Sequence, residues 1–305
     1  MRTADYVRLL TLAAIWGSSF IFMRVLAPVL GPVVTADARI LIAGSVLSLW
    51  FAVTGFALDW KREWRQYLVI GAISSALPFM LFAYAAAHIP AGFSAIYNST
   101  APLFGAVCGA LWLGERFTFN RGLGLFAGLA GVALVSRASS SATDEQFAPA
   151  TLACLGAAAC YALGGVYLKR RASHLKPAMI TAGSQLAGGL LLLPLTPMLP
   201  PAGGIDATIV LNGLALALMC SGAAYLIYYR LIADIGPTRA LSVTFLIPVF
   251  GLLWAFLFLG ERITGGMLTG CALVLVGTWL VTRSAAPVQS RPASTVGAMD
   301  DEVSG

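Results

Sequence analysis

Charge is what this sequence has least of. Only 10% of its 305 residues are charged, whereas 59% are hydrophobic. A soluble domain carries about 25% charged residues, because its surface must face water. The scarcity of charge excludes a soluble globular enzyme, a disordered chain, a coiled coil and a disulfide-stapled secreted domain. It favours a polytopic α-helical membrane protein.

Groups that carry out chemistry are also scarce. The two histidines, His88 and His174, fall in predicted loops on opposite faces, so neither can serve as the base for a nucleophile inside the membrane. The five cysteines lie within apolar runs and lack metal-ligand spacing, so we interpret them as small hydrophobic residues. No phosphate-binding loop of the Gly-x-x-x-x-Gly-Lys-[Ser/Thr] type is present. The sequence therefore predicts no catalytic residue, no metal site and no cofactor.

Long apolar runs dominate the rest of the chain. A helix needs about 20 apolar residues to cross the hydrocarbon core of a bilayer. The predicted spans are 4–26, 35–57, 65–87, 91–113, 118–136, 149–169, 177–198, 208–230, 239–260 and 264–283. We therefore predict an all-α fold with ten transmembrane helices and short connections.

Ten crossings place both termini on the same side of the membrane. Fifteen of the 19 basic residues then fall on that side, and the other four are Arg24, Arg39, Arg137 and Arg262. Cytoplasmic loops are enriched in Lys and Arg, which predicts cytoplasmic N- and C-termini. The net charge of +6 is explained by this asymmetry, so it calls for the lipid bilayer as a partner and for no nucleic acid.

The second half of the chain repeats the first. At an offset of 146 residues, the segment Leu113-Gly114-Glu115-Arg116 aligns with Leu259-Gly260-Glu261-Arg262, and Pro102 aligns with Pro248. Because each copy holds five spans, the second enters the membrane from the opposite side, as in inverted-repeat transporters. The predicted units are a first repeat (1–137), an outer loop (138–148), a second repeat (149–283) and a disordered cytoplasmic tail (284–305).

These two halves resemble the drug/metabolite transporter superfamily, in its ten-helix EamA branch. Each half ends its fourth span in Leu-Gly-Glu and continues into a glycine-rich fifth span, and the segment Trp-Gly-Ser-Ser-Phe at 16–20 also fits. The resemblance implies a central cavity between spans 1–4 and 6–9, with spans 5 and 10 at the periphery. It also implies a bacterial inner-membrane exporter of amino acids or related metabolites, most similar to the exporters of aromatic amino acids.

Three prolines are candidates for hinges. Pro102 and Pro248 lie in mid-span at matching positions of the two repeats, and each removes one helical hydrogen bond. Pro78 does the same in span three, without a counterpart in the second repeat. Such kinks either bend during alternating access or are static and satisfied by a neighbouring helix.

Polar side chains gather next to these kinks. Asn98, Ser99 and Thr244 lie at membrane depth, where a polar side chain must face protein or water. An amide offers both donors and acceptors, which suits a small polar organic solute. Hydrogen bonding between helices is the alternative interpretation.

Aromatic residues surround the same level. Tyr161 on span six is the near-equivalent of Trp16 on span one, and Phe79 on span three corresponds to Tyr225 on span eight. Ser19 shares the helix face of Trp16. We expect these side chains to line the substrate cavity, although core packing explains them equally well.

Asp37 and Arg39 begin span two near the predicted outer face. They are candidates for an outer gate, and the resemblance identifies Arg39 as the usual basic residue of the family, which either holds that gate or attracts a carboxylate. The alternative is that the side chain extends to the lipid headgroups. No acidic residue lies unambiguously at the midplane, so we expect a central site that is polar but largely uncharged.

The leading hypothesis is a secondary transporter of a small organic solute that works by alternating access. An exporter of cationic drugs from the same superfamily is the alternative. A passive pore and an intramembrane enzyme are remote, because the chain lacks charged rings and a nucleophile–base pair. The sequence leaves open a monomer or a homodimer, the direction of transport and proton coupling.

Overall fold

The computed structural model describes residues 2–138 and 145–283. Every regular element in these two ranges is helical, so the predicted polytopic all-α fold is confirmed. Seven helical runs are long and apolar enough to cross a membrane, and Val243–Leu259 is an apolar helix of shorter length. The predicted tail at 284–305 lies outside the described residues, as does most of the predicted outer loop.

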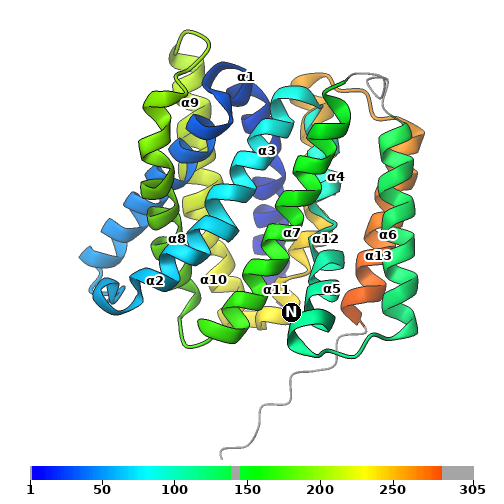
Figure 1. The fold of residues 1–305 in the computed structure, drawn as a ribbon, viewed down its shortest axis with the longest axis horizontal. Helices are drawn as coiled ribbons and strands as arrows, with labels where there is room; N and C mark the ends of the chain where they lie inside the picture. Colours follow the sequence, from blue (N-terminus) through cyan, green and yellow to red (C-terminus); the bar gives the residue numbers. More distant parts are fainter. Residues whose placement is uncertain (1, 139–144, 284–305) are drawn as a thin grey trace, which may run out of the picture.

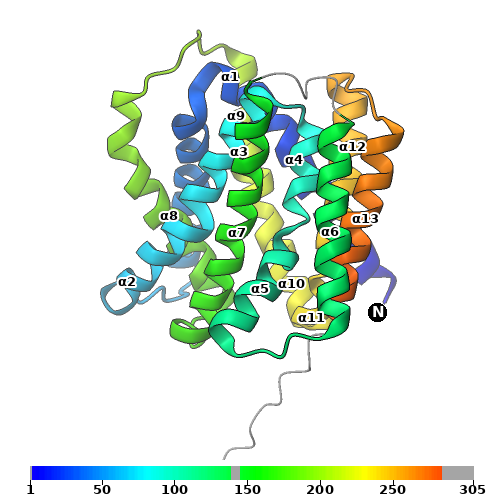
Figure 2. The same ribbon diagram turned by 45° about the vertical axis from the view of Figure 1, so that its right-hand side comes forward.

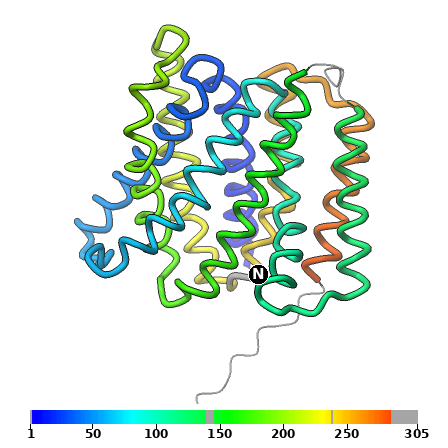
Figure 3. The backbone as a smooth tube through the Cα atoms, viewed as in Figure 1, coloured from blue at the N-terminus to red at the C-terminus, as the bar shows by residue number. Residues whose placement is uncertain are grey.

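The first two predicted spans form one helical run, α1 (Thr3–Val53), which is interrupted only at Gly31. Gly31 has φ 76° and ψ 165°, a conformation that side-chain-bearing residues rarely adopt. Figure 3 shows the chain rising from the N-terminus, reversing its direction and descending again. The predicted loop at 27–34 is therefore wrong: a single glycine makes the turn, and both flanks stay helical.

Spans three to five complete the first repeat. Span three contains an internal π-helical segment, and span four is divided into two helices by a turn at Ser99–Thr100. The elements are α2 (Trp60–Gly71), the π-helix η1 (Ala72–Ala76), α3 (Leu77–His88), α4 (Ala91–Asn98), α5 (Ala101–Leu113) and α6 (Phe119–Arg137).

The second repeat follows the same plan. Its elements are α7 (Phe147–Arg171), α8 (Pro177–Leu192), the 3-10 helix η2 (Leu193–Met198), α9 (Ala207–Leu214), the π-helix η3 (Ala215–Ala223), α10 (Ala224–Ile235), α11 (Pro237–Ala240), α12 (Val243–Leu259) and α13 (Gly265–Arg283). Because α1 makes two crossings and several others are built from consecutive pieces, these elements account for ten passages. The N-terminus and the end of α13 lie at the same end of the bundle, as an even number requires (Figure 1).

The two repeats share one irregularity and differ in another. The π-helices η1 and η3 occupy corresponding stretches of spans three and eight, although only η1 precedes a proline. Pro102 lies in the first turn of α5, just after the break in span four. Pro248 lies inside α12, which is uninterrupted. The break in span nine comes earlier, at Leu241–Ser242, before α12 begins. The predicted equivalence of the two proline kinks is therefore wrong.

Helices α6 and α13 pack against each other at the edge of the bundle (Figure 2). Their glycines allow the backbones to touch. A Cβ built on Gly124 would lie 2.6 Å from the carbonyl oxygen of Gly277, and one on Gly131 would lie 2.7 Å from that of Gly270. Small residues permit this close approach in membrane helices. Spans five and ten are therefore peripheral and use their glycines to pair within the chain.

Candidate functional site

A cavity of about 410 Å³ lies between the two repeats. Its volume is within the range of small-molecule sites. The walls come from spans one to four, six, eight and nine. The lining residues are Trp16, Ser19, Phe20, Met23, Arg39, Phe79, Phe82, Asn98, Ser99, Ala101, Pro102, Tyr161, Tyr225, Tyr228, Leu241, Val243, Thr244 and Ile247.

This wall brings together the side chains that the sequence singled out for substrate contact. All eight line the cavity: Trp16, Ser19, Phe79, Asn98, Ser99, Tyr161, Tyr225 and Thr244. Pro102 and Arg39 line it as well, whereas Pro78, Pro248 and Asp37 do not. Contact with a substrate stays a prediction, but the shared location follows from the fold.

The aromatic residues form two groups, and each group combines both repeats. Trp16 of α1 lies 5.6 Å from Tyr225 and 5.3 Å from Tyr228 of α10, between ring centroids. Tyr161 of α7 lies 6.4 Å from Phe79 and 6.3 Å from Phe82 of α3. These separations suit edge-to-face and offset stacking. The sides of the cavity are thus related by the approximate symmetry of the repeats.

Phe82 and Tyr228 are site residues that the sequence reasoning missed. The signal was available, because the 146-residue offset that pairs Phe79 with Tyr225 also pairs Phe82 with Tyr228. Residues three apart share one face of a helix. Each of these helices therefore presents two aromatic rings to the cavity.

Two backbone carbonyls of the π-helix η3 accept hydrogen bonds from side chains of other helices. The indole N–H of Trp16 donates to the carbonyl of Cys220 at 3.2 Å, and the amide of Gln185 donates to the carbonyl of Ser221 at 3.2 Å. A π-helical segment disturbs the regular ladder and is frequent at functional sites. These bonds fix the orientation of Trp16 relative to α10.

The turn between α4 and α5 supplies the polar part of the wall. Its carbonyl at Ser99 accepts a hydrogen bond from Thr278 of α13 at 3.0 Å, so a neighbouring helix satisfies the broken backbone. The hydroxyl of Ser99 donates to Ile96 at 2.6 Å. Asn98 is half-buried, and no described residue forms a hydrogen bond with its amide. Of this turn, Asn98 is the group free to bind a solute.

Arg39 places a positive charge in the cavity. Its side chain is buried, donates from Nε to the Ser221 hydroxyl at 2.8 Å, and stacks 3.8 Å from the centroid of the Phe79 ring. The expectation of a largely uncharged site is therefore wrong. The predicted span began at 35, but the helix resumes directly after Gly31, so Arg39 lies two turns inside it.

Asp37, the other candidate for an outer gate, points elsewhere. It is buried, and its Oδ1 has no hydrogen-bond partner. It does not line the cavity. Within the described ranges, no three His, Cys, Asp or Glu side chains cluster closely enough to hold a metal ion.

At the end of the bundle opposite the N-terminus, the two repeats are in contact. Helix α4 packs on α12, and Glu261 from the loop after α12 accepts hydrogen bonds from the backbone N–H groups of Ala91 at 2.7 Å and Gly92 at 3.0 Å. A carboxylate is favoured at a helix N-terminus, where N–H groups lack partners. Glu261 therefore caps α4 from the other repeat and ties the two repeats together at this end.

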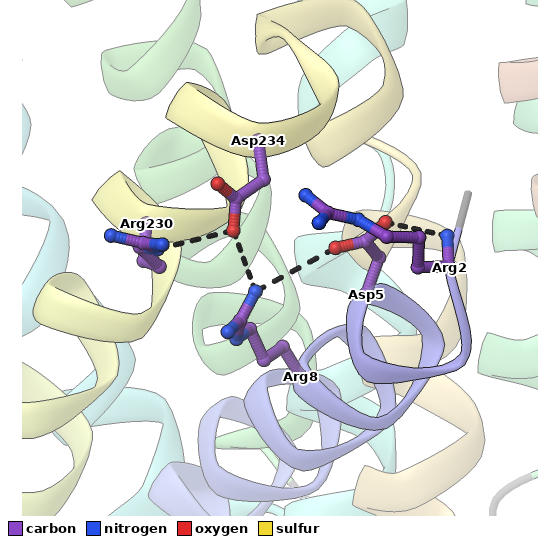
Figure 4. A network of polar contacts seen from close by, with 5 residues as sticks. All are labelled: Arg2, Asp5, Arg8, Arg230 and Asp234. Atoms are coloured by element: carbon purple, nitrogen blue, oxygen red, sulfur yellow. Dashed lines mark hydrogen bonds and ion pairs between the residues drawn. The ribbon is translucent and has the colours of Figure 1, made fainter.

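At the N-terminal end, ion pairs tie neighbouring helices on each side of the cavity. Arg8 of α1 reaches Asp234 of α10 at 2.6 Å, and Arg230 reaches the same carboxylate at 3.1 Å (Figure 4). On the other side, Glu115 pairs with Arg121 at 2.9 Å and with Lys169 at 3.0 Å.

Helix α5 packs on α7 and α13 at this end, while α11 packs on α10. The cavity wall extends to Leu241, which is 52% exposed. The cavity wall therefore reaches the surface of the bundle beside α11.

Known proteins share both the sequence pattern and the fold. The model of the EamA-like transporter family matches residues 6–137 and 148–283. The chain is 28% identical to the uncharacterized transporter YvbV of Bacillus subtilis, with 92% of each chain covered. It is 25% identical to a probable terminal-alkyne amino-acid exporter of Streptantibioticus cattleyicolor, over 92% of this chain and 94% of that protein.

A probable amino-acid metabolite efflux pump of Escherichia coli is also 25% identical, over 92% of this chain and 95% of its own. One solved crystal structure has the same fold, with a TM-score of 0.65 and 19% identity over 93% of this chain and 98% of its own. The family match covers both repeats and therefore most of the chain. The protein belongs to the EamA-like transporter family and is a multi-pass membrane transporter, not an enzyme.

Proposed function

We propose that this transporter exports amino acids with apolar or aromatic side chains, or related small metabolites, across a bacterial inner membrane. The observation that carries the proposal is the cavity between the repeats, where two aromatic groups face Asn98 and Arg39. Aromatic rings suit an apolar body, while the amide and the guanidinium suit polar ends. The names of two relatives, which refer to amino-acid export and efflux, agree with this chemistry.

The arrangement of the two ends supports alternating access. Contacts between the repeats are present at both ends: Glu261 caps α4 at one end, and the ion pairs Arg8–Asp234 and Glu115–Lys169 join the repeats at the other. With cytoplasmic termini, as the distribution of basic residues predicts, these ion pairs lie on the cytoplasmic side. Alternating access would then require the Glu261 cap and the ion pairs to break in turn, as the repeats rock against each other.

A counterflow screen in proteoliposomes tests the proposal. Vesicles are loaded with one unlabelled compound and offered its labelled form, first with amino acids and then with cationic drugs, each with and without a proton gradient. We expect phenylalanine or another apolar amino acid to exchange. Exchange of cationic drugs alone would refute the assignment and favour the drug exporter.

A further inference from the structure

The guanidinium of Arg39 is a buried charge without a counter-ion. The residue is 6% exposed, and none of the ion pairs among the described residues includes it. Arginine stays protonated in proteins. A charge removed from water is costly unless a partner of opposite sign compensates it. The positive charge of Arg39 in the cavity is therefore not balanced by a negatively charged side chain.

The partners that Arg39 does have hold it in place without neutralising it. Nε donates to the Ser221 hydroxyl at 2.8 Å, one terminal nitrogen lies 3.7 Å from the sulfur of Met23, and the Phe79 ring stacks against the plane. These contacts use two of the five N–H groups of a guanidinium. The remaining N–H groups are available to an oxygen in the cavity that the side chain lines.

The cavity wall offers nothing comparable to a cation. No aspartate or glutamate is present among the lining residues, and the polar atoms apart from Arg39 belong to hydroxyls, the indole of Trp16 and the Asn98 amide. An ammonium group would meet aromatic faces, which attract it weakly, and the like charge of Arg39, which repels it.

We propose that Arg39 is the carboxylate anchor of the central site, so that the transporter selects organic monocarboxylates with an apolar or aromatic body and does not require an amino group. This inference rests on the proposed function and narrows its substrate class. The guanidinium binds the carboxylate through charge-assisted hydrogen bonds, and the two aromatic groups enclose the remainder. Amino acids bind as one subset, through the carboxylate that they share with simple acids.

Binding is tested on the purified full chain with three compounds that share a phenyl ring and a short linker. Phenylalanine carries both charges, 3-phenylpropanoate carries only the carboxylate, and 2-phenylethylamine carries only the ammonium. Affinity is measured from ligand-dependent shifts of the thermal unfolding curve in detergent. We expect the two carboxylates to bind within about threefold of each other and the amine to bind at least tenfold more weakly.

Substitutions of Arg39 and Arg24 distinguish an effect of the Arg39 charge on binding from an effect on folding. Arg39→Gln should weaken both carboxylates tenfold or more and leave the amine unweakened. Arg24→Gln is the matched control, because Arg24 lies on the same helix, donates to the Ala86 carbonyl at 2.6 Å and does not line the cavity. If Arg39→Gln does not fold, Arg39→Lys keeps the charge but loses the planar fork, and a smaller loss of carboxylate affinity is expected.

Equal binding of the amine, or unchanged carboxylate affinity in Arg39→Gln, would overturn the inference. Counterflow of the same three compounds reports separately on the proposed function. If the carboxylates bind through Arg39 but no compound is exchanged, the anchor stands and the transport proposal fails. If phenylalanine and the amine exchange equally well, transport stands and the anchor is refuted.

Discussion

The cap that Glu261 places on α4 gives a quantitative prediction. The substitution Glu261→Gln keeps the shape of the side chain but replaces one acceptor oxygen by an NH2 group that cannot accept. One of the two bonds to Ala91 and Gly92, at 2.7 and 3.0 Å, is therefore lost. A hydrogen bond to a charged group contributes about 1.5–3 kcal/mol, and the charge at the helix N-terminus adds about 0.3–1 kcal/mol. We expect a loss of about 2–4 kcal/mol.

The repeat supplies a matched control for this substitution. Glu115 holds the same place in the first Leu-Gly-Glu-Arg segment, but it pairs with Lys169 and Arg121 and caps no helix. Its side chain is 32% exposed, its partner Lys169 is 49% exposed and its partner Arg121 is 4% exposed. The glutamine keeps one acceptor oxygen for Arg121, and ion pairs with exposed members contribute about 0–1 kcal/mol each, so Glu115→Gln should cost about 2 kcal/mol or less.

Equilibrium unfolding of both variants in mixed detergent micelles measures the difference. The free energy of unfolding should fall more in Glu261→Gln than in Glu115→Gln. Equal losses, or a larger loss in Glu115→Gln, would refute the idea that the carboxylate of Glu261 holds the two repeats together.

Three further predictions follow from the packing, the surface charges and the topology. Gly124→Ala brings a methyl group to 2.6 Å from the Gly277 carbonyl oxygen and should destabilise the fold by about 1–3 kcal/mol. Gly122→Ala is the control on the same helix, because its methyl group meets its first neighbour at 3.5 Å and should be tolerated. Equal unfolding curves for the two variants would contradict the close packing of α6 on α13. The hydrogen bond from Lys169, helped by Arg121, holds the pKa of Glu115 below its ordinary value of 4.5, so this carboxylate stabilises the fold above that pH. Its contribution should disappear as the pH falls through the lowered pKa, and Glu115→Gln should lack that part of the acid sensitivity in unfolding measurements. A reporter fused to the C-terminus should be active only in the cytoplasm, and periplasmic activity would reverse the orientation.

Composition and repetition were sufficient to predict the helical class and a set of side chains that line one cavity. Apolar runs separated by basic loops follow directly from the cost of polar groups in lipid, and the offset of 146 residues brings Phe79 and Tyr225 into related positions. Side chains at matching places of two inverted repeats meet at their interface. That is why the predicted polar and aromatic residues line one cavity.

The local backbone geometry of the turns and π-helices could not be predicted from the sequence. A lone Gly31 reverses the chain where a loop of eight residues was predicted, because hydropathy averaged over a window does not reveal one residue with positive φ. The π-helix η3 carries no proline, so nothing in its composition marks it.

The predicted position of Arg39 at the outer face was wrong for a related reason. Arg39 was assigned to the outer face because it begins an apolar run, and arginines at such positions commonly extend to the headgroups. The fold instead supplies a Ser221 hydroxyl and a Phe79 ring from other helices, which hold the guanidinium inside. The cap formed by Glu261 likewise joins residues that are far apart in the chain, since Glu261 is 170 positions from Ala91 and 169 from Gly92.

The central claim is that a solute crosses through the cavity between the repeats. Counterflow of labelled phenylalanine should therefore be lost or greatly reduced in Trp16→Ala and in Asn98→Ala, at unchanged amounts of folded protein. Trp112→Ala, at a 44% exposed site on α5 outside the cavity wall, should exchange like the wild type. Wild-type exchange in both cavity variants would contradict the account.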